Sequence, residues 1–147
     1  MPARKSTKSF TVISGEAYVD TSALIAFADR SDTYHPLFRR LFADPPRLTT
    51  TALVLAEGHG WFLKRYDAAR GLQFLAMVES MPLNMATFGP RELQAATALI
   101  RKYADQDLTL TDAAGLYWME FRRIRVCWST DFHLGLTGVP LAIHIQR

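Results

Sequence analysis

The sequence lacks features that several classes of protein require. Its one cysteine, Cys127, excludes an intrachain disulfide and a cysteine-based zinc site, and is typical of a reducing compartment. No apolar run approaches the ~20 residues of a membrane-spanning helix, and no apolar segment follows the basic residues 1–9 as a secretory signal would need. There is also no glycine-rich phosphate-binding loop. We therefore expect a cytoplasmic protein with no membrane attachment.

What is present suits one globular domain. The chain has 147 residues, of which 49% are hydrophobic and 21% charged, so it can bury a core. The formal net charge of +3 permits an anionic partner without establishing one. Basic residues occur in clusters, among them Arg122 and Arg123. For any one cluster a solvated helix face is the simpler explanation, and contact with the phosphates of a nucleic acid is the alternative.

Short apolar segments alternate with longer helical patterns along the chain. The patterns predict strands at residues 17–19, 47–50, 82–85, 125–128 and 140–145, and the principal helices at 21–28, 34–42, 51–66, 67–79, 90–103 and 109–123. Such alternation implies crossover connections and a mainly parallel sheet covered on both faces. We therefore predict one α/β domain at residues 17–147, preceded by a basic extension at 1–16 that forms a flexible tail, an extra strand or an arm touching nucleic acid.

Three acids are predicted at one edge of this sheet. Asp20 directly follows the first strand, Asp131 follows the fourth, and Asp112 lies in the first turn of a helix. Ligands of an open parallel sheet bind beyond the carboxyl ends of its strands. Each acid also has a structural explanation as a helix cap or a capping-box partner, Asp112 with Thr109. Taken singly, capping is the better explanation; together, three acids at one edge favour a site.

Glu57 is a fourth candidate, predicted inside a helix. Helical spacing places it on an apolar stripe with Val54 and Trp61. A buried carboxylate is costly unless it is paired or binds a metal, and no lysine or arginine lies within one turn of it. We therefore expect Glu57 to be buried and to join the other acids.

Carboxylates gathered in one pocket repel one another unless protons or a cation neutralise them. Carboxylate oxygens suit the hard cations Mg²⁺ and Mn²⁺. A divalent ion of this kind lowers the pKa of a bound water and offsets the charge of a phosphate. The four acids are therefore suited to hydrolysis of a phosphodiester bond.

Four segments in order resemble the motifs of PIN-domain ribonucleases. The segments are residues 18–24 (YVDTSAL), 53–57 (LVLAE), 103–113 (YADQDLTLTDA) and 129–134 (STDFHL). Each motif alone is weak, whereas the four in this order are fairly specific. The likeness extends from about Ala17 to the C-terminus.

The resemblance implies a three-layer α/β/α sandwich and Mg²⁺- or Mn²⁺-dependent cleavage of RNA. Compact bacterial members of this size are commonly VapC-type toxins, which are inhibited by a cognate antitoxin and are commonly dimers. By the same likeness Asp20, Glu57, Asp112 and Asp131 form the metal site. The basic charge of Arg122 and Arg123, and not the likeness, makes that cluster a candidate contact with the RNA.

Other residues near the motifs have more than one interpretation. Asp107 is either a fifth acid near the rim or a loop acid that bonds the backbone at Thr109. Ser22 and Ser129 either orient the carboxylates or only cap helices. We interpret His133 as a structural histidine, with substrate contact as the less favoured role.

Two other functions remain to be weighed. An aspartyl phosphatase would have a second aspartate two residues after Asp20, where this sequence has Ser22. The stronger alternative is a PIN-like domain without activity that binds RNA or protein. Retention of all four acids argues against it, because a scaffold has no use for carboxylates that repel one another.

Overall fold

A computed structural model describes residues 15–145 of the chain. Its sheet has four strands in the order β4-β3-β2-β5, all parallel, with β2 at Glu16–Val19, β3 at Arg47–Thr51, β4 at Leu83–Ala86 and β5 at Val126–Trp128. The strand order places β2 between β3 and β5, in the centre of the sheet. The carboxyl ends of all four strands therefore lie at one edge.

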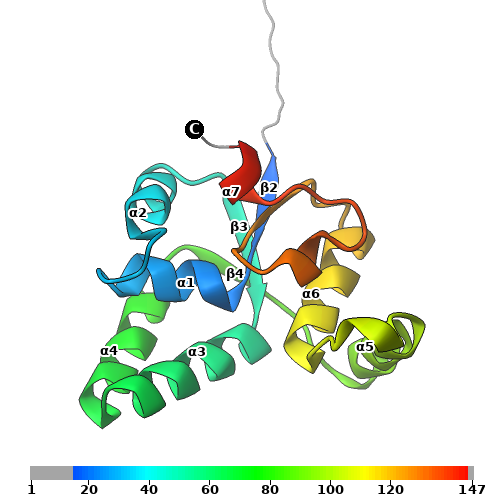
Figure 1. Cartoon of the computed structure of the whole chain (residues 1–147), viewed down its shortest axis with the longest axis horizontal. Helices are drawn as coiled ribbons and strands as arrows, with labels where there is room; N and C mark the ends of the chain where they lie inside the picture. Colours follow the sequence, from blue (N-terminus) through cyan, green and yellow to red (C-terminus); the bar gives the residue numbers. More distant parts are fainter. Residues whose placement is uncertain (1–14, 146–147) are drawn as a thin grey trace, which may run out of the picture.

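Helices cover both faces of the sheet, which confirms the predicted three-layer α/β/α fold (Figure 1). On one side are α1 (Thr21–Ala28), α2 (His35–Ala43), α3 (Ala52–Arg65) and α4 (Ala68–Glu79), and on the other are α5 (Pro90–Lys102) and α6 (Leu110–Phe121). Alternate residues of β2 serve the two faces, as strand geometry requires. Ala17 and Val19 belong to the core under α1–α4, and Tyr18 to the core under α6.

Two glycines permit close contacts that hold these layers together. A Cβ at Gly58 in α3 would lie 2.3 Å from Cζ of Phe74 in α4. A Cβ at Gly115 in α6 would lie 2.8 Å from Cε2 of Tyr18 in β2. Glycine weakens a helix interior relative to alanine, but at these two positions the absence of a side chain allows the neighbouring elements to pack more closely.

The C-terminal segment differs from the prediction. Residues 140–145 do not form a strand, because only Leu141 makes a bridge, with Cys127 of β5. The chain then turns into the short helix α7 (Ala142–Ile145). A short apolar run is compatible with either a strand or a helix, so periodicity alone could not decide this segment.

Most of the predicted extension at residues 1–16 falls outside the described residues. The exceptions are Gly15 and Glu16, and Glu16 is the first residue of β2. Within residues 15–145, no helix combines the length and the apolar character needed to cross a membrane.

Candidate metal centre

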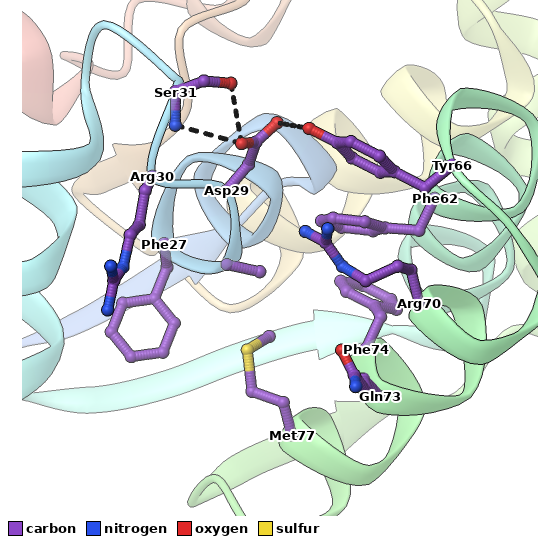
Figure 2. Close-up of a pocket in the computed structure, with 11 residues that line it drawn as sticks. Phe27, Asp29, Arg30, Ser31, Phe62, Tyr66, Arg70, Gln73, Phe74 and Met77 are labelled. Carbon is purple, nitrogen blue, oxygen red and sulfur yellow. Dashed lines mark hydrogen bonds between the residues drawn. The ribbon is translucent and has the colours of Figure 1, made fainter.

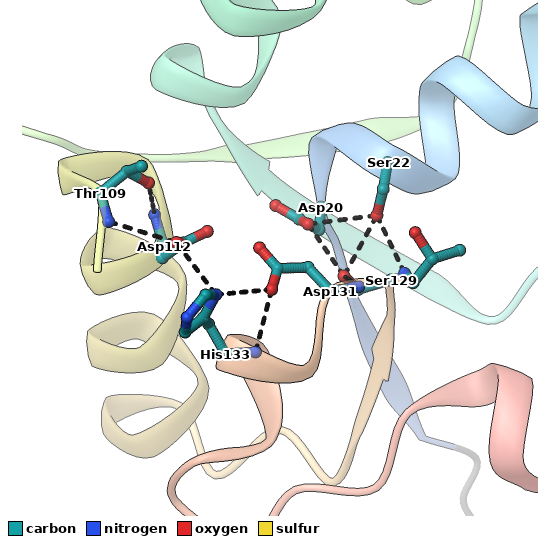
Figure 3. Close-up of polar contacts among 8 residues, drawn as sticks. Asp20, Ser22, Thr109, Asp112, Ser129, Asp131 and His133 are labelled. Atoms are coloured by element: carbon teal, nitrogen blue, oxygen red, sulfur yellow. Dashed lines mark hydrogen bonds and ion pairs between the residues drawn. The ribbon is translucent and has the colours of Figure 1, made fainter. Parts of the chain in front are cut away.

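Three predicted acids meet where strands β2 and β5 end beside the start of α6. Asp20 follows β2, and its backbone N–H donates to the carbonyl of Trp128 at the end of β5 (3.0 Å). Asp131 begins the short 3-10 turn η3 (Phe132–Gly135), and Asp112 lies in the first turn of α6. Figure 3 shows these acids on neighbouring elements. The topology of the sheet therefore brings together acids separated by up to 111 positions in the sequence.

Asp20 is buried and is held by two serines. Only 3% of the surface of Asp20 is exposed to solvent. The hydroxyl of Ser129 donates to Oδ2 of Asp20 (2.9 Å), and the hydroxyl of Ser22 donates to the same oxygen (3.3 Å). Both hydroxyls also accept a hydrogen bond from the backbone between β5 and η3, Ser22 from the N–H of Thr130 and Ser129 from the N–H of Asp131, at 2.9 Å each. Ser22 and Ser129 therefore fix the Asp20 carboxylate as well as the backbone that leads to Asp131.

The environment of Asp20 disfavours its charged form. Burial raises the pKa of the Asp20 carboxyl from 3.8 to about 6, and the charges of Asp112 and Asp131 add to this effect, whereas the Ser129 hydrogen bond opposes it. A site that holds a carboxylate at this cost has a use for negative charge, and a bound cation would remove the penalty.

Asp112 closes a capping box at the start of α6. Its N–H donates to the hydroxyl of Thr109 (3.0 Å), and its Oδ2 accepts the N–H of Thr109 (3.2 Å). The capping explanation for Asp112 is therefore correct, and it does not exclude the site. Burial raises the pKa of the Asp112 carboxyl, and the neighbouring charge of Asp131 raises it further.

His133 lies between two of the acids (Figure 3). Its Nδ1 is 2.8 Å from Oδ1 of Asp131 and 3.9 Å from Oδ2 of Asp112. Burial alone would lower the pKa of the imidazole, but the Asp131 hydrogen bond and the two carboxylate charges raise it overall. From the sequence we interpret His133 as structural, and its contact with the acids is not predicted, although a histidine two residues after Asp131 on a tight turn is a usable signal.

The donors at this edge fit a divalent cation. One ligand atom from each of Asp112, Asp131 and His133 lies within 4.8 Å of the other two. Asp20 lines the same pocket as Asp131 and is close enough for the charge of Asp131 to raise its pKa. Carboxylate oxygens favour Mg²⁺ or Mn²⁺ over softer metals, and the His133 ring is hydrogen-bonded to one of these carboxylates. The chemistry of the donors therefore agrees with the predicted class of ion.

Glu57 is not buried as predicted. Its side chain is exposed on α3, where it lines a cavity of about 570 Å³ together with Asp20 and Asp131. The helical pattern identified the correct face but not whether another element covers it. Glu57 therefore lines the pocket of Asp20 and Asp131 but lies outside the close group of Asp112, Asp131 and His133.

The geometry also places the remaining predicted residues. Arg122 makes a two-point ion pair with Glu16, at the amino end of β2 and thus at the sheet edge opposite to Asp20. Arg123 is the next residue after Arg122, and its backbone is in the left-handed region (φ 55°). Asp107 is exposed at the end of η2 (Ala104–Gln106). Of its two predicted roles, the bond to the Thr109 N–H is not made, because Asp112 accepts from that N–H, and the role of a fifth acid near the rim stays a prediction.

A larger cavity of about 650 Å³ lies between the end of α1 and helices α3 and α4 (Figure 2). Its carboxylate, Asp29, already accepts hydrogen bonds from Ser31 (2.7 Å from the hydroxyl) and from the hydroxyl of Tyr66 (3.0 Å). Burial would raise the pKa of Asp29, but these hydrogen bonds lower it overall. With one satisfied acid and no second one, this cavity lacks the donors of a metal centre.

Comparison with known proteins identifies relatives of the chain. The family model of the PIN domain matches residues 17–124. Ribonuclease VapC26 of Mycobacterium tuberculosis (strain ATCC 25618 / H37Rv) is 25% identical over 114 residues, which cover 77% of this chain and 84% of VapC26.

Two solved structures share the fold. One is the crystal structure of Mycobacterium tuberculosis VapC20, a sarcin-ricin loop cleaving toxin, with a TM-score of 0.76 and 20% identity over 84% of this chain and 95% of VapC20. The other is a toxin-antitoxin complex from Klebsiella pneumoniae, with a TM-score of 0.57 and 20% identity over 86% of this chain and 95% of that chain.

Proposed function

The chain belongs to the PIN domain family, and from this premise we propose that it is a Mg²⁺- or Mn²⁺-dependent endoribonuclease acting as the toxin of a toxin–antitoxin pair. The observation that carries the proposal is the convergence of Asp20, Asp112 and Asp131 at one edge of the sheet, close enough for the charge of Asp131 to raise the pKa values of the other two. The similarity to Ribonuclease VapC26 supports RNA as the substrate.

Asp20, Asp112 and Asp131 would hold the ion, and Glu57 lines the pocket that Asp20 and Asp131 share. A divalent ion at this position supplies an acidified water and offsets the charge of the scissile phosphate. The protein provides the fixed negative charge that such an ion requires.

The surrounding side chains hold these carboxylates in place. Ser22 and Ser129 donate to one oxygen of Asp20, and Thr109 fixes Asp112 through its backbone N–H. His133 holds Oδ1 of Asp131 with its ring and with its backbone N–H (3.0 Å). Hydrogen bonds that orient the ligands in this way sustain metal affinity and activity.

We further propose a cognate antitoxin as a protein partner and a homodimer as the working form. The solved toxin-antitoxin complex from Klebsiella pneumoniae, which shares the fold, supports the antitoxin. A small gene for a DNA-binding protein directly upstream would add to this support.

The alternative is a PIN-like domain that binds RNA or protein without cutting. It requires no cation, so it leaves the cost of the buried Asp20 carboxylate unexplained. The nuclease proposal accounts for that cost, and we favour it.

Cleavage mapping on total RNA tests the proposal. The full chain should cut RNA with Mg²⁺ or Mn²⁺ and stop when EDTA is added, and Asp131→Asn should not cut. Asp44→Asn, which removes the same charge at an exposed site after α2, is the matched control and should cut normally. Cleavage that continues in EDTA or in Asp131→Asn would refute the proposed metal site.

A further inference from the structure

A groove leads away from the acid cluster between α1 and α3. It is lined by Asp20, Asp131 and Glu57, by Ile25 of α1, and by Trp61 and Lys64 of α3. Along α3, Trp61 lies about one turn and Lys64 about two turns beyond Glu57. Its lining thus changes from acidic through apolar to basic. An ion in the acidic part would leave the rest of the groove free for a substrate.

Gly60 keeps the middle of this groove open. It lines the groove, and a Cβ built on it meets no atom within 4 Å. This differs from Gly58 in the same helix, whose missing side chain is explained by contact with Phe74. Glycine weakens a helix interior, and packing gives no compensation at Gly60. The free space that it leaves belongs to the groove.

Lys64 and Trp61 provide complementary contacts on the same face of α3. Lys64 follows Glu57 by seven residues, two helical turns or about 10 Å along the axis. It is exposed and forms no ion pair with any described residue. Trp61 is half-buried, and its ring packs edge-on against Phe62 at 4.9 Å between centroids. A fixed aromatic ring and a free cation suit a base and a phosphate, respectively.

We infer that the α1–α3 groove binds the single-stranded RNA next to the cleavage point. A base contacts Trp61, Gly60 gives the strand room, and Lys64 pairs with a phosphate. Single strands are commonly bound by aromatic stacking together with a cation along the backbone. The inference rests on the proposed function, and it makes Lys64 and Trp61 substrate-positioning residues.

Binding of a short, fluorescein-labelled single-stranded RNA of mixed sequence tests this assignment. Fluorescence anisotropy is measured on the full chain in the Asp131→Asn background with Mg²⁺, so that affinity is independent of cleavage. Lys64→Ala should raise the Kd several-fold at low salt and reduce the slope of log Kd against log salt by about 0.7. Arg65→Ala is the matched control, because Arg65 is the next residue of α3, is exposed and does not line the groove. Arg65→Ala should change neither quantity.

The glycine provides a second, independent variant. Gly60→Leu should raise the Kd more than Gly60→Ala, and thermal unfolding must show that both variants are folded. Equal effects of Lys64→Ala and Arg65→Ala, or an unchanged Kd in Gly60→Leu, would overturn the RNA assignment. So would groove variants that lose a co-purifying protein while their RNA affinity stays the same.

The two proposals can fail separately. If the wild-type chain cleaves RNA but the groove variants bind and cut normally, the groove assignment is wrong and the nuclease stands. If the groove variants lose RNA binding while the wild-type chain cuts nothing with Mg²⁺ or Mn²⁺, the groove stands and the nuclease assignment is wrong.

Discussion

Asp20 combines the deepest burial with the clearest electrostatic penalty among the clustered acids. Its residue is 3% exposed, against 6% for Asp112, and its carboxyl has a pKa of about 6. Its folded-state pKa exceeds the unfolded value, so the folded chain binds more protons between pH 4 and 6. The stabilisation by protonated Asp20 is complete below pH 3.8 and is lost as the pH rises through about 6.

Asp20→Asn should therefore abolish RNA cleavage and stabilise the metal-free protein at neutral pH. The raised pKa corresponds to at most roughly 3 kcal/mol. Thermal unfolding in EDTA at pH 5 and pH 8 is the measurement. The difference in stability between the variant and the wild type should be larger at pH 8 than at pH 5. A difference that does not grow with pH would contradict the account.

His133 is expected to position Asp131. Removing the imidazole in His133→Ala would free Oδ1 of Asp131, which the ring now holds at 2.8 Å. Loss of such a ligand-orienting contact costs about 10- to 100-fold in metal affinity or activity. The Mn²⁺ concentration for half-maximal cleavage should rise by about that factor, with much of kcat restored at saturating Mn²⁺. An unchanged Mn²⁺ dependence would remove His133 from the site.

Helix α3 carries two glycines, and its packing predicts opposite effects for them. Gly58→Ala places a methyl group 2.3 Å from the buried ring of Phe74 and should lower the free energy of unfolding by about 1–3 kcal/mol. Gly60→Ala meets no atom within 4 Å and should raise it by up to ~1 kcal/mol through helix propensity. Urea denaturation of both variants measures these changes. Changes in the free energy of unfolding that have the same sign in both variants would contradict the packing.

The ion pair between Arg122 and Glu16 connects the end of α6 to the start of β2. Burial alone would raise the pKa of Glu16, but hydrogen bonds from Thr49 and Arg122 and the Arg122 charge lower it overall. Stability from this pair is therefore present above pH 4.5 and is lost as the pH falls through the lowered pKa.

Arg122→Ala should lower the free energy of unfolding at pH 7 by about 1 kcal/mol, since both side chains are partly exposed. RNA cleavage should not change, because the pair lies at the sheet edge away from Asp20. Unfolding curves at pH 7 and below pH 4 should show the difference disappearing in acid. A strong loss of RNA binding would instead restore Arg122 as an RNA contact.

At the scale of the whole molecule, local signals were sufficient to predict the sheet and most helices. Breakers and caps mark the ends of elements in the sequence: α1 has the predicted bounds, and the side chain of Asp67 caps α4 by accepting the N–H of Arg70. The parallel topology then follows from the alternation of strands and helices. The meeting of Asp20, Asp112 and Asp131 was predictable because it depends on topology more than on side-chain packing.

What could not be predicted depends on contacts between distant segments. The exposure of Glu57 is decided by whether another element covers its face of α3, and the pairing of Arg122 joins residues 106 positions apart. The bridge of Leu141 with Cys127 likewise decides a segment that is locally ambiguous. Helical and strand periodicity contain no information about such contacts.

Anomalous diffraction from crystals of the full chain soaked in Mn²⁺ tests the central claim most directly. The account predicts a Mn²⁺ peak coordinated by carboxylate oxygens of Asp20, Asp112 and Asp131, and the loss of that peak in Asp20→Asn. A fully soaked crystal with no peak among these carboxylates, or with Mn²⁺ bound only elsewhere on the chain, would contradict it.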